Sequence, residues 1–476
     1  MRIEKHPILN FAERKSFTFK YNGVDIIAKE GDTVVSALCA SGKYKLRNSA
    51  VKKRPRGLFC AIGDCSSCVM EVNGVSNVRT CITLAEPGMV VNSVEGNVKL
   101  RDISMHAYVP TPKCLETDIA VIGGGPAGLK AALAAAECGA NVIIVDQNHT
   151  LGGQLIKQTH KFFGSVEYYA GIRGIDIARE LIEKVDKNQN ISVLLNSTVT
   201  GFLDDNLLQV NIEHGSRLYN IHCKKTIVAC GANEVMLGVP KNDLPGVYGA
   251  GAIQTITNVH GVKIGKKVLV VGAGNVGLIL AYQLLQADIE VAAVVEAASQ
   301  IGGFAVHANK IRRRGVPILL SHSVVKIEGK NHVSAATIAR LDEKFNPIPG
   351  TEQILDVDTI ALAVGLQPNY RPCSQAKCDV EYAAELCGFV PMRNKYMETS
   401  NKNILTAGDC SGIGEATTAM IEGELAGLRA AQVLGLANES VVERQKELIA
   451  VGGEFRGAGK KGSIMLKGLE SVYIHE

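Results

Sequence analysis

The chain contains no tryptophan, and only 5% of its residues are aromatic. A surface that stacks nucleic-acid bases needs several exposed aromatic rings, so this class of binding protein is disfavoured. The formal net charge is +4 over 476 residues, which leaves no strongly basic face for a phosphate backbone. We therefore expect no nucleic-acid partner.

Long hydrophobic runs are also missing. No uninterrupted apolar stretch reaches the ~20 residues that a membrane span needs, and the first six residues lack the apolar segment of a secretory signal. We expect a cytoplasmic protein without a membrane span. Its thirteen cysteines are an odd number in a chain of this kind, so most should be free thiols or metal ligands rather than disulfides.

Several catalytic signatures are absent as well. The sequence shows no Ser–His–Asp order, no metal-binding pair of histidines on a helix and no evident carboxylate pair. The cysteine pair of disulfide reductases is missing from the helix after Gly128 and from the second nucleotide unit. Farther on, Cys373-x4-Cys378-x8-Cys387 lacks a nearby fourth ligand, so we interpret these thiols as packing residues. Nothing local identifies an organic substrate.

The most informative feature present is a cysteine loop with the spacing C-x4-C-x2-C and a later cysteine, formed by Cys60, Cys65, Cys68 and Cys81. This spacing matches plant-type [2Fe–2S] ferredoxins, whose soft thiolate ligands suit iron. A zinc site usually shows two short paired knuckles, and only one is present here. The pattern favours a [2Fe–2S] centre over zinc or a loop without metal.

The residues before this loop predict a small β-grasp domain. Residues 16–21 alternate at period two, Asn22-Gly23 is a strong hairpin signal, and residues 24–28 form the return strand. Thr33 can cap a short helix over residues 34–39. This order of elements is typical of ferredoxin-like domains and supports the cluster assignment.

A glycine-rich turn then follows an apolar strand and opens a helix, with the sequence Gly123-Gly124-Gly125-Pro126-Ala127-Gly128. In such a turn the first glycine permits the bend, the second admits a pyrophosphate and the third lets helix and strand approach. The helix N-terminus favours the phosphate charge. Asp146 ends the next strand, where an acid hydrogen-bonds a ribose hydroxyl.

A distant segment makes FAD the favoured ligand of this first turn. Residues 403–409 form an apolar strand that ends in Gly408-Asp409, and a helix of small residues follows. In two-dinucleotide-binding flavoproteins this segment closes the flavin domain, which would place Asp409 near the ribityl or pyrophosphate group. Gly153 and Gln154 would lie beside the isoalloxazine ring. Cys230 occupies a position usually held by threonine, and we favour a packing role for it over a reactive one.

A second unit of the same kind starts about 150 residues later, with Gly272, Gly274, Asn275 and Gly277 in its turn. Glu296 ends the following strand, and a carboxylate there favours NAD over NADP because it repels a 2′-phosphate. Three alternatives stay open for this site: a working nicotinamide site, a bound adenine nucleotide without a redox role, and a relic that binds nothing.

These motifs predict an α/β protein: a β-grasp ferredoxin-like domain followed by a Rossmann-type two-dinucleotide-binding flavoprotein, with the second nucleotide domain inserted in the first. The predicted boundaries are residues 1–105 for the [2Fe–2S] domain, 106–116 for a linker, 117–245 and 367–436 for the FAD domain and 246–366 for the inserted domain. Residues 437–476 are expected to form a partly loose C-terminal tail that can dock on another surface.

With these motifs in this order, the chain resembles the electron-transfer subunits of multi-subunit amino-acid and amine dehydrogenases, a group that includes sarcosine oxidase, hydrogen cyanide synthase, opine oxidase and dye-linked proline dehydrogenase. The resemblance spans residues ~16–435 and rests on the cysteine loop and the two glycine turns. It implies FAD and [2Fe–2S] cofactors and a partner flavoprotein of the D-amino-acid-oxidase type, so a hetero-oligomer with an external electron acceptor is expected. Many relatives have another cysteine cluster beyond the Gly-Asp helix, and this chain has no cysteine after Cys410.

Three functions remain open at this point. The first is an electron-transfer subunit of an amino-acid or amine dehydrogenase complex. The second is a self-contained NADH:acceptor oxidoreductase, which the complete second turn would support. The third is a structural subunit that binds nucleotide without catalysis.

Overall fold

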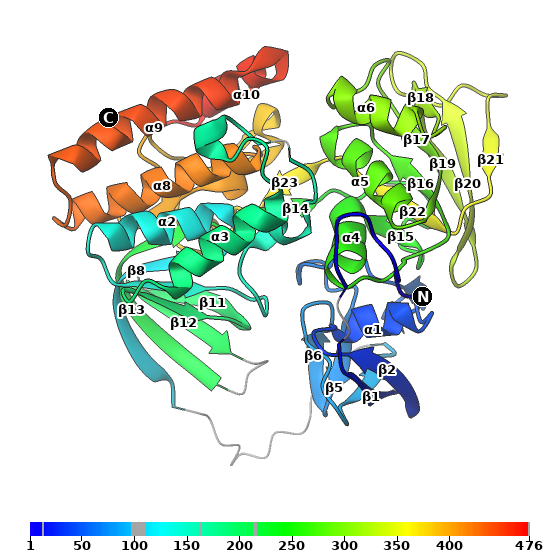
Figure 1. Cartoon of the computed structure of the whole chain (residues 1–476), viewed down its shortest axis with the longest axis horizontal. Helices are drawn as coiled ribbons and strands as arrows, with labels where there is room; N and C mark the ends of the chain where they lie inside the picture. Colours follow the sequence, from blue (N-terminus) through cyan, green and yellow to red (C-terminus); the bar gives the residue numbers. More distant parts are fainter. Residues whose placement is uncertain (12–13, 97–110, 162, 205, 213–216, 475–476) are drawn as a thin grey trace. The chain divides into compact units, whose positions relative to one another are not determined.

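A computed structural model describes residues 1–11, 14–96, 111–161, 163–204, 206–212 and 217–474 (Figure 1). The chain forms two compact units, of which unit 1 comprises Met1–His106 with Glu234–Gly365, and unit 2 comprises Ala107–Asn233 with Leu366–Glu476. The end of the predicted first domain, 97–105, and the start of the predicted linker, 106–110, lie outside the described residues. Strand β8 already begins at Lys113, inside the segment for which we predicted a linker.

The first part of unit 1 has the predicted β-grasp order. A five-stranded mixed sheet has the strand order β2-β1-β7-β5-β6, and one helix lies between β2 and the cysteine loop. The bounds are β1 (Ser16–Tyr21), β2 (Val24–Lys29), α1 (Val34–Ala40), β3 (Arg47–Asn48), β4 (Pro55–Arg56), β5 (Val69–Val72), β6 (Val75–Arg79) and β7 (Val90–Ser93). The Thr33 side chain accepts a hydrogen bond from the Ser36 N–H at 3.2 Å, which caps α1 as predicted.

The second part of unit 1 contains a parallel five-stranded sheet in the order β15-β22-β16-β17-β18 and an antiparallel sheet β19-β20-β21. Its elements are β15 (Val247–Gly249), α4 (Ala250–Gln254) with a continuing π-turn (Thr255–Val259), β16 (Lys267–Val271), α5 (Asn275–Gln286), β17 (Glu290–Glu296), α6 (Ala305–Arg312), β18 (Ile318–Leu320), β19 (His322–Gly329), β20 (Val333–Arg340), β21 (Gln353–Leu355) and β22 (Thr359–Leu362). Strand β22 is buried along its whole length, as expected for a parallel strand covered on both faces.

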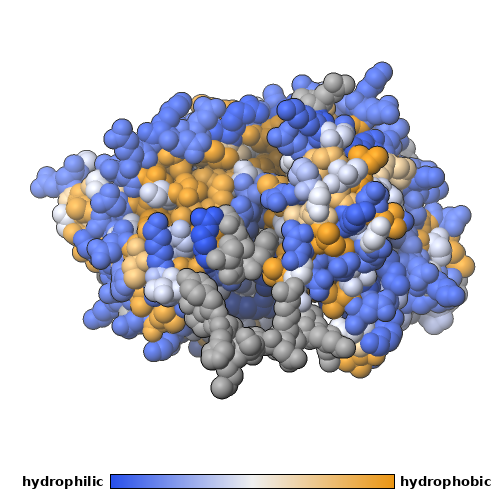
Figure 2. Space-filling view, turned by 90° about the horizontal axis from the view of Figure 1, so that it is seen from below, coloured by the Kyte–Doolittle hydropathy of each residue, from blue (hydrophilic) through white to orange (hydrophobic). Residues whose placement is uncertain are grey.

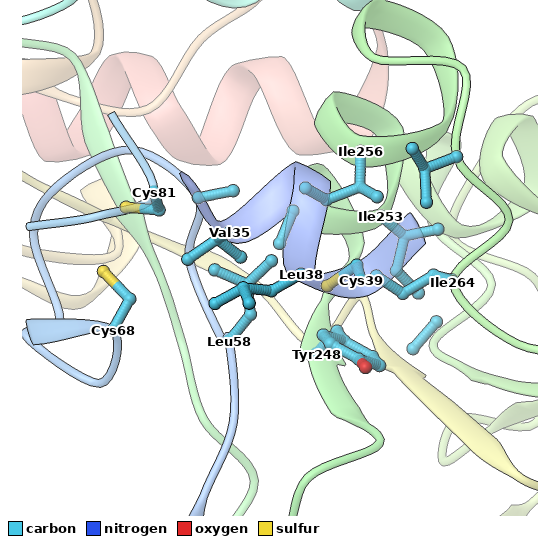
Figure 3. Close-up of a cluster of buried hydrophobic side chains, with 14 of the residues drawn as sticks. Val35, Leu38, Cys39, Leu58, Cys68, Cys81, Tyr248, Ile253, Ile256 and Ile264 are labelled. Carbon is cyan, nitrogen blue, oxygen red and sulfur yellow. The ribbon is translucent and has the colours of Figure 1, made fainter. Parts of the chain in front are cut away.

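The two parts of unit 1 share a hydrophobic core. Leu38 and Cys39 of α1 and Leu58 of the cysteine loop belong to the same buried cluster as Tyr248 and Ile253 of the nucleotide domain (Figure 3). The ion pair from Arg56 to Asp243, at 3.0 Å, joins the two parts nearby. The ferredoxin-like domain and the second nucleotide domain are therefore one folded body, an arrangement that no sequence pattern indicated.

Unit 2 contains the first glycine turn. Its sheet has the order β10-β9-β8-β13-β12-β11, with β26 parallel to β13. Its elements are β8 (Lys113–Ile122), α2 (Pro126–Glu137), β9 (Val142–Val145), α3 (Gly174–Asp186), β10 (Ile191–Leu194), β11 (Ser197–Asp204), β12 (Leu207–Ile212), β13 (Arg217–Val228), β14 (Ala232–Glu234, which ends at the border with unit 1), β23 (Leu366–Pro368), α7 (Arg371–Gln375), β24 (Val380–Ala383), β25 (Gly388–Pro391), β26 (Ile404–Thr406), α8 (Ala416–Val433), α9 (Glu439–Gly457) and α10 (Gly459–Ser471).

The C-terminal region is more ordered than the partly loose tail that we predicted. Helices α9 and α10 occupy it, and α9 packs along α8 (Figure 1). Arg456 of α9 is buried and donates through Nε to the Glu422 carboxylate of α8 at 2.9 Å. Arg393 donates to the same carboxylate at 2.9 Å. The many glycines of this region lower its local helix propensity, which is why we expected little regular structure. Tertiary contacts stabilise the helices that form there.

The surface shows no single dominant apolar face in the view of Figure 2, where hydrophobic side chains form several patches among hydrophilic ones. Among the helices that the structure describes, none combines the length and the hydrophobicity that crossing a bilayer requires.

Candidate cofactor sites

The four cysteines of the predicted cluster come together in unit 1. Cys60 and Cys65 lie in the loop after β4, Cys68 directly precedes β5, and Cys81 follows β6. The β5–β6 hairpin holds the last two close, since Thr80 Oγ1 donates to the carbonyl of Cys68. Hydrogen bonds between thiols link Cys60 with Cys65 and with Cys81, and Cys68 with Cys81.

The backbone of this loop turns its N–H groups toward the sulfurs. Ala61, Gly63 and Ser66 all have positive φ angles, of 52°, 75° and 56°. The N–H of Cys65 lies 3.5 Å from Cys60 Sγ, and the N–H of Ser67 donates to the sulfur of Cys65. Thiolates in an iron–sulfur site accept such hydrogen bonds, which influence the reduction potential.

The donor set fits a [2Fe–2S] centre. The hydrogen bond from Cys65, followed by that from Cys81, lowers the pKa of Cys60, whereas the pKa of Cys81 is raised by its bonds to Cys60 and Cys68. Four thiolates this close repel one another unless cations neutralise them. Within the described ranges no group of three or more His, Cys, Asp or Glu side chains could hold a single metal ion. A binuclear centre needs only two cysteines for each iron.

The first glycine turn, in unit 2, has the geometry that dinucleotide binding requires. Gly123 has φ +105°, and a Cβ there would lie 2.4 Å from the Ala229 carbonyl oxygen. A Cβ on Gly128 would lie 1.8 Å from the oxygen of Gly123, so helix α2 approaches the turn as closely as the motif demands. Gly125 precedes α2, and Pro126 and Ala127 form its first turn. The nearest atom to a Cβ on Gly125 would be 3.8 Å away, which leaves space for a phosphate.

Asp146 is fixed at the end of β9. Its Oδ2 accepts the N–H of Gly124 at 2.6 Å, and its Oδ1 accepts the N–H of Asn148 at 2.8 Å. The carboxylate is buried, and burial raises its pKa despite these two hydrogen bonds. A ribose hydroxyl is a donor that would compensate for this lost hydration.

The segment after Asp146 folds back over the turn. Gly152 donates its N–H to the carbonyl of Gly124 at 2.8 Å, and Gly153 has φ +52° and lies against Gly125. A short 3₁₀ helix, Gly153–Lys157, includes Gln154 and ends with a buried lysine. No sequence motif indicated that Lys157 would be buried in this segment.

The Gly-Asp closure also lies in unit 2. Gly408 has φ +77°, its N–H donates to the buried Glu422 carboxylate at 2.9 Å, and a Cβ on it would lie 3.0 Å from the Cβ of Ala127. Asp409 Oδ1 accepts the N–H of Gly414 at 2.9 Å. Burial raises the pKa of Asp409 to about 6. Cys230 donates to the carbonyl of Ile122 at 3.6 Å, and burial raises its pKa, so the thiol form and a packing role are favoured.

The second glycine turn, in unit 1, has the same backbone path. Gly272 has φ +106°, and a Cβ on Gly277 would lie 2.0 Å from the Gly272 oxygen. A Cβ on Gly274 would meet no atom within 4 Å, so a ligand can approach. Glu296 accepts the Ala273 N–H at 2.7 Å. Asn275 begins α5, and its Oδ1 accepts the Phe304 N–H at 2.9 Å.

The internal duplication extends beyond the glycine turns. Residues 151–154, with the sequence Leu-Gly-Gly-Gln, correspond to residues 301–304, Ile-Gly-Gly-Phe, which follow Glu296 at the same offset. Gly302 and Gly303 donate their N–H groups to the Ala273 carbonyl at 3.1 and 2.9 Å. The internal duplication therefore includes the segment that covers each turn, and the paired glycines were its detectable signal.

The cysteine loop is attached to the sheet that carries the second turn. The carbonyl of Phe59, which precedes Cys60, accepts the N–H of Gly249 at 3.0 Å. Gly249 ends β15, which is parallel to β22 and lies two strands from β16. Adjacent strands are about 4.8 Å apart, so the anchoring point of the loop is on the order of 10 Å from the strand that enters the Gly272 turn.

Two protein families match the chain. Residues 117–423 match the family described as pyridine nucleotide-disulphide oxidoreductase, and residues 14–96 match a 2Fe-2S iron-sulfur cluster binding domain. The chain is 27% identical over 465 residues to the alpha subunit of sarcosine oxidase from Corynebacterium sp. (strain U-96), covering 93% of this chain and 46% of that protein. It is 26% identical over 346 residues to an opine oxidase subunit of Rhizobium meliloti, covering 68% of this chain and 64% of that protein.

A solved structure shares the fold over most of the chain. L-proline dehydrogenase from P. horikoshii matches with a TM-score of 0.69 and 23% identity, covering 93% of this chain and 79% of that one. The chain spans about half the length of the sarcosine oxidase subunits that it matches. The predicted fold class, the FAD and [2Fe–2S] cofactors and the family resemblance are confirmed. The chain belongs to the pyridine nucleotide-disulphide oxidoreductase family and is an FAD-dependent oxidoreductase with a [2Fe–2S] domain.

Proposed function

We propose that this chain is the electron-transfer subunit of an amino-acid or amine dehydrogenase complex, with a substrate-oxidising flavoprotein of the D-amino-acid-oxidase type as its partner. The observation that carries the proposal is an alignment with a sarcosine oxidase subunit over 93% of the chain, which includes both the cluster loop and the flavin turn. The hydrogen cyanide synthase and opine oxidase relatives are also named as subunits.

In this proposal, separate groups of residues bind the two cofactors. The N–H groups at the start of α2 bind the pyrophosphate of FAD, Asp146 orients its ribose, and Asp409 contacts the ribityl or pyrophosphate region. Cys60, Cys65, Cys68 and Cys81 hold the irons. When bound, FAD can accept two electrons and the cluster can pass electrons singly. None of the thirteen cysteines forms a disulfide, which suits a reducing cytoplasm.

Purification under native conditions tests this proposal. We expect a second flavoprotein chain to co-purify, and the complex to reduce an artificial acceptor in the presence of an amine. A Cys68→Ser, Cys81→Ser variant should keep its FAD and lose its iron, and acceptor reduction should fall at least tenfold. Cys223→Ser is the matched control, because Cys223 is a buried thiol of unit 2 outside the cluster. Amine oxidation by the chain alone would contradict the proposal.

A second function, as an NADH:acceptor oxidoreductase, is favoured by one observation. The cysteine loop is anchored on the sheet of the second glycine turn, so a nucleotide there would bind close to the cluster domain. Anaerobic addition of NADH should then bleach the flavin absorbance at ~450 nm. Glu296→Gln should slow the bleaching, whereas an unchanged spectrum of the wild-type protein would exclude this function.

A further inference from the structure

Helix α7 of unit 2 ends in a turn that brings two cysteines together. Lys377 has φ +59°, its N–H donates to the Ser374 carbonyl at 3.0 Å, and the N–H of Cys378 donates to the Cys373 carbonyl at 3.0 Å. These two bonds define a Schellman motif, in which the side chains of the first and last residues, usually hydrophobic, contact each other. Here both of those residues are cysteines.

The backbone bond limits the separation of the two residues. The path from the Cα of Cys373 through its carbonyl and the 3.0 Å hydrogen bond to the Cα of Cys378 spans at most about 7 Å. Disulfides join Cα atoms that are about 4.4–6.8 Å apart. The two thiols are already hydrogen-bonded to each other. A disulfide between them would therefore need only a small movement of the side chains.

The two thiols have different surroundings, which suggests different roles. Cys378 is a buried member of the core, 6% exposed, and its sulfur is 3.2 Å from Thr399 Oγ1. The hydrogen bond from Cys373, with others from Thr399 and the Asn401 N–H, lowers the pKa of Cys378. Cys373 is fully buried, and its bond to Cys378 together with burial raises its pKa. Cys378 is the better nucleophile, because the thiolate is the reactive form.

The pair lies in the core that supports the flavin closure. Cys373, Cys378 and Cys410 belong to one buried cluster, and Cys410 directly follows Asp409. Cys410 donates to the carbonyls of Val228 and Ala407, both at 3.3 Å, so it has backbone partners of its own. Cys387, the third cysteine of the sequence pattern, is exposed and is not part of this core cluster.

We propose that Cys373 and Cys378 form a redox-active dithiol that hydrogen peroxide converts reversibly into an intramolecular disulfide. The Cys378 thiolate attacks one peroxide oxygen, the O–O bond breaks, and the hydroxide released takes up a proton to leave as water. The resulting sulfenic acid is attacked by Cys373, which loses its proton as the S–S bond forms and a second water leaves. Two thiols lose two electrons in total, and one peroxide molecule gains them. This site is independent of the proposed function.

Peptide mass mapping of the full-length holoprotein tests the proposal. The protein is treated with increasing concentrations of hydrogen peroxide, and its remaining thiols are alkylated. The mass of the peptide that contains both cysteines is then measured. We expect it to lose two hydrogens (about 2 Da) before buried Cys223 is modified, and to regain them with dithiothreitol while the flavin absorbance persists. Two alkylated thiols in this peptide, at peroxide concentrations that already oxidise the exposed Cys114, would overturn the proposal.

Two variants separate the roles of the thiols. Cys373→Ser should leave Cys378 as a sulfenic acid that dimedone captures, and Cys378→Ser should leave Cys373 unmodified. Cys410→Ser is the matched control, since it removes a buried thiol of the same core and should leave disulfide formation unchanged. Dimedone labelling of Cys373 instead of Cys378 would contradict the assigned roles. The mapping of the wild-type protein stands even if a variant fails to fold.

Discussion

The glycine turn of unit 2 and the glycine turn of unit 1 follow the same backbone path and differ in what surrounds them. Gly123 and Gly272 have φ angles of +105° and +106°. In each turn, a Cβ on the third glycine would collide with the carbonyl oxygen of the first. In unit 2, Gly124 is enclosed, because a Cβ there would lie 2.3 Å from Leu151. The equivalent position in unit 1 is Ala273, whose methyl group is accommodated.

The segments that close the two turns differ more strongly. In unit 2 the strand beyond β13 is β26, which leads into Gly408-Asp409 and supplies a carboxylate, whereas in unit 1 the strand beyond β22 is β15, which leads into Ala250-Gly251 and supplies no acid. Helix α2 is also in close contact with α8 in unit 2. The motif therefore sets the path of the turn, and the two turns differ in the groups that surround it.

The largest expected effect comes from the third glycine of each turn. Gly128→Val would place side-chain atoms on the Gly123 oxygen, which is 1.8 Å from the position of a Cβ, so FAD content should fall more than tenfold. Gly277→Val introduces the same clash in unit 1, at 2.0 Å, and should leave the FAD content unchanged. Flavin released per chain is the measurement. Equal FAD loss in both variants would show that the turns are not independent.

The next effect concerns the contact between α2 and α8. A Cβ on Gly423 would lie 2.1 Å from the Ala127 oxygen, and one on Gly427 would lie 2.2 Å from that of Ala131. Each Gly→Ala change should destabilise unit 2 by about 1–3 kcal/mol, seen as a lower Tm. Gly453→Ala in α9 is the control, because nothing lies within 4 Å of its Cβ position. It should stabilise the helix by up to about 1 kcal/mol.

Substituting Asp146 or Glu296, the acid that follows each turn, should affect the binding of different nucleotides. Asp146→Asn removes a charged acceptor for a ribose hydroxyl, a loss of about 1.5–3 kcal/mol that raises the Kd for FAD on the order of 10- to 100-fold. Glu296→Gln should leave FAD binding unchanged and weaken the preference of the second site for NAD over NADP. Equilibrium titration of each ligand measures this, and a change in FAD affinity in the Glu296 variant would argue against separate sites.

A pH effect of smaller size should be confined to the closure of unit 2. Because the pKa of Asp409 in the folded state is about 6, above its ordinary value of 3.8, its ionised form destabilises the FAD-free protein at neutral pH. Asp409→Asn should therefore stabilise the FAD-free protein on the order of 2 kcal/mol at pH 7.5. The difference should shrink as pH falls through about 6 and vanish below about 4, where wild-type Asp409 is protonated.

Asp118→Asn is a control of opposite sign for this measurement. The Lys224 ammonium, bonded to Asp118 at 2.7 Å, lowers the pKa of that carboxyl, so its ionised form stabilises the fold at neutral pH. The variant should be less stable than wild type at pH 7.5, with a difference that disappears in acid. Thermal denaturation from about pH 2 to pH 8 records both curves, because the Asp118 difference is lost only below its ordinary pKa of 3.8. A pH-independent gap for Asp409→Asn would disprove the assigned cause.

The sequence by itself determined the local elements. The short spacings among Cys60, Cys65 and Cys68 specify a tight ligand loop, and the glycines at 123, 125 and 128 specify a strand–turn–helix, because these patterns depend on backbone angles and steric limits within a few residues. The strand, hairpin and helix before the cluster follow from period-two alternation, Asn-Gly and a capping threonine for the same local reason.

Only the tertiary structure decided how these pieces combine. Leu38 and Leu58 are ordinary apolar residues in sequence, and nothing local says that they pack against Tyr248 and Ile253 of the second nucleotide domain. Helices α9 and α10 form in a glycine-rich segment because α8 and a buried ion pair support them. Hydrophobic burial is not directional, so its partners depend on contacts between residues that are far apart in the chain.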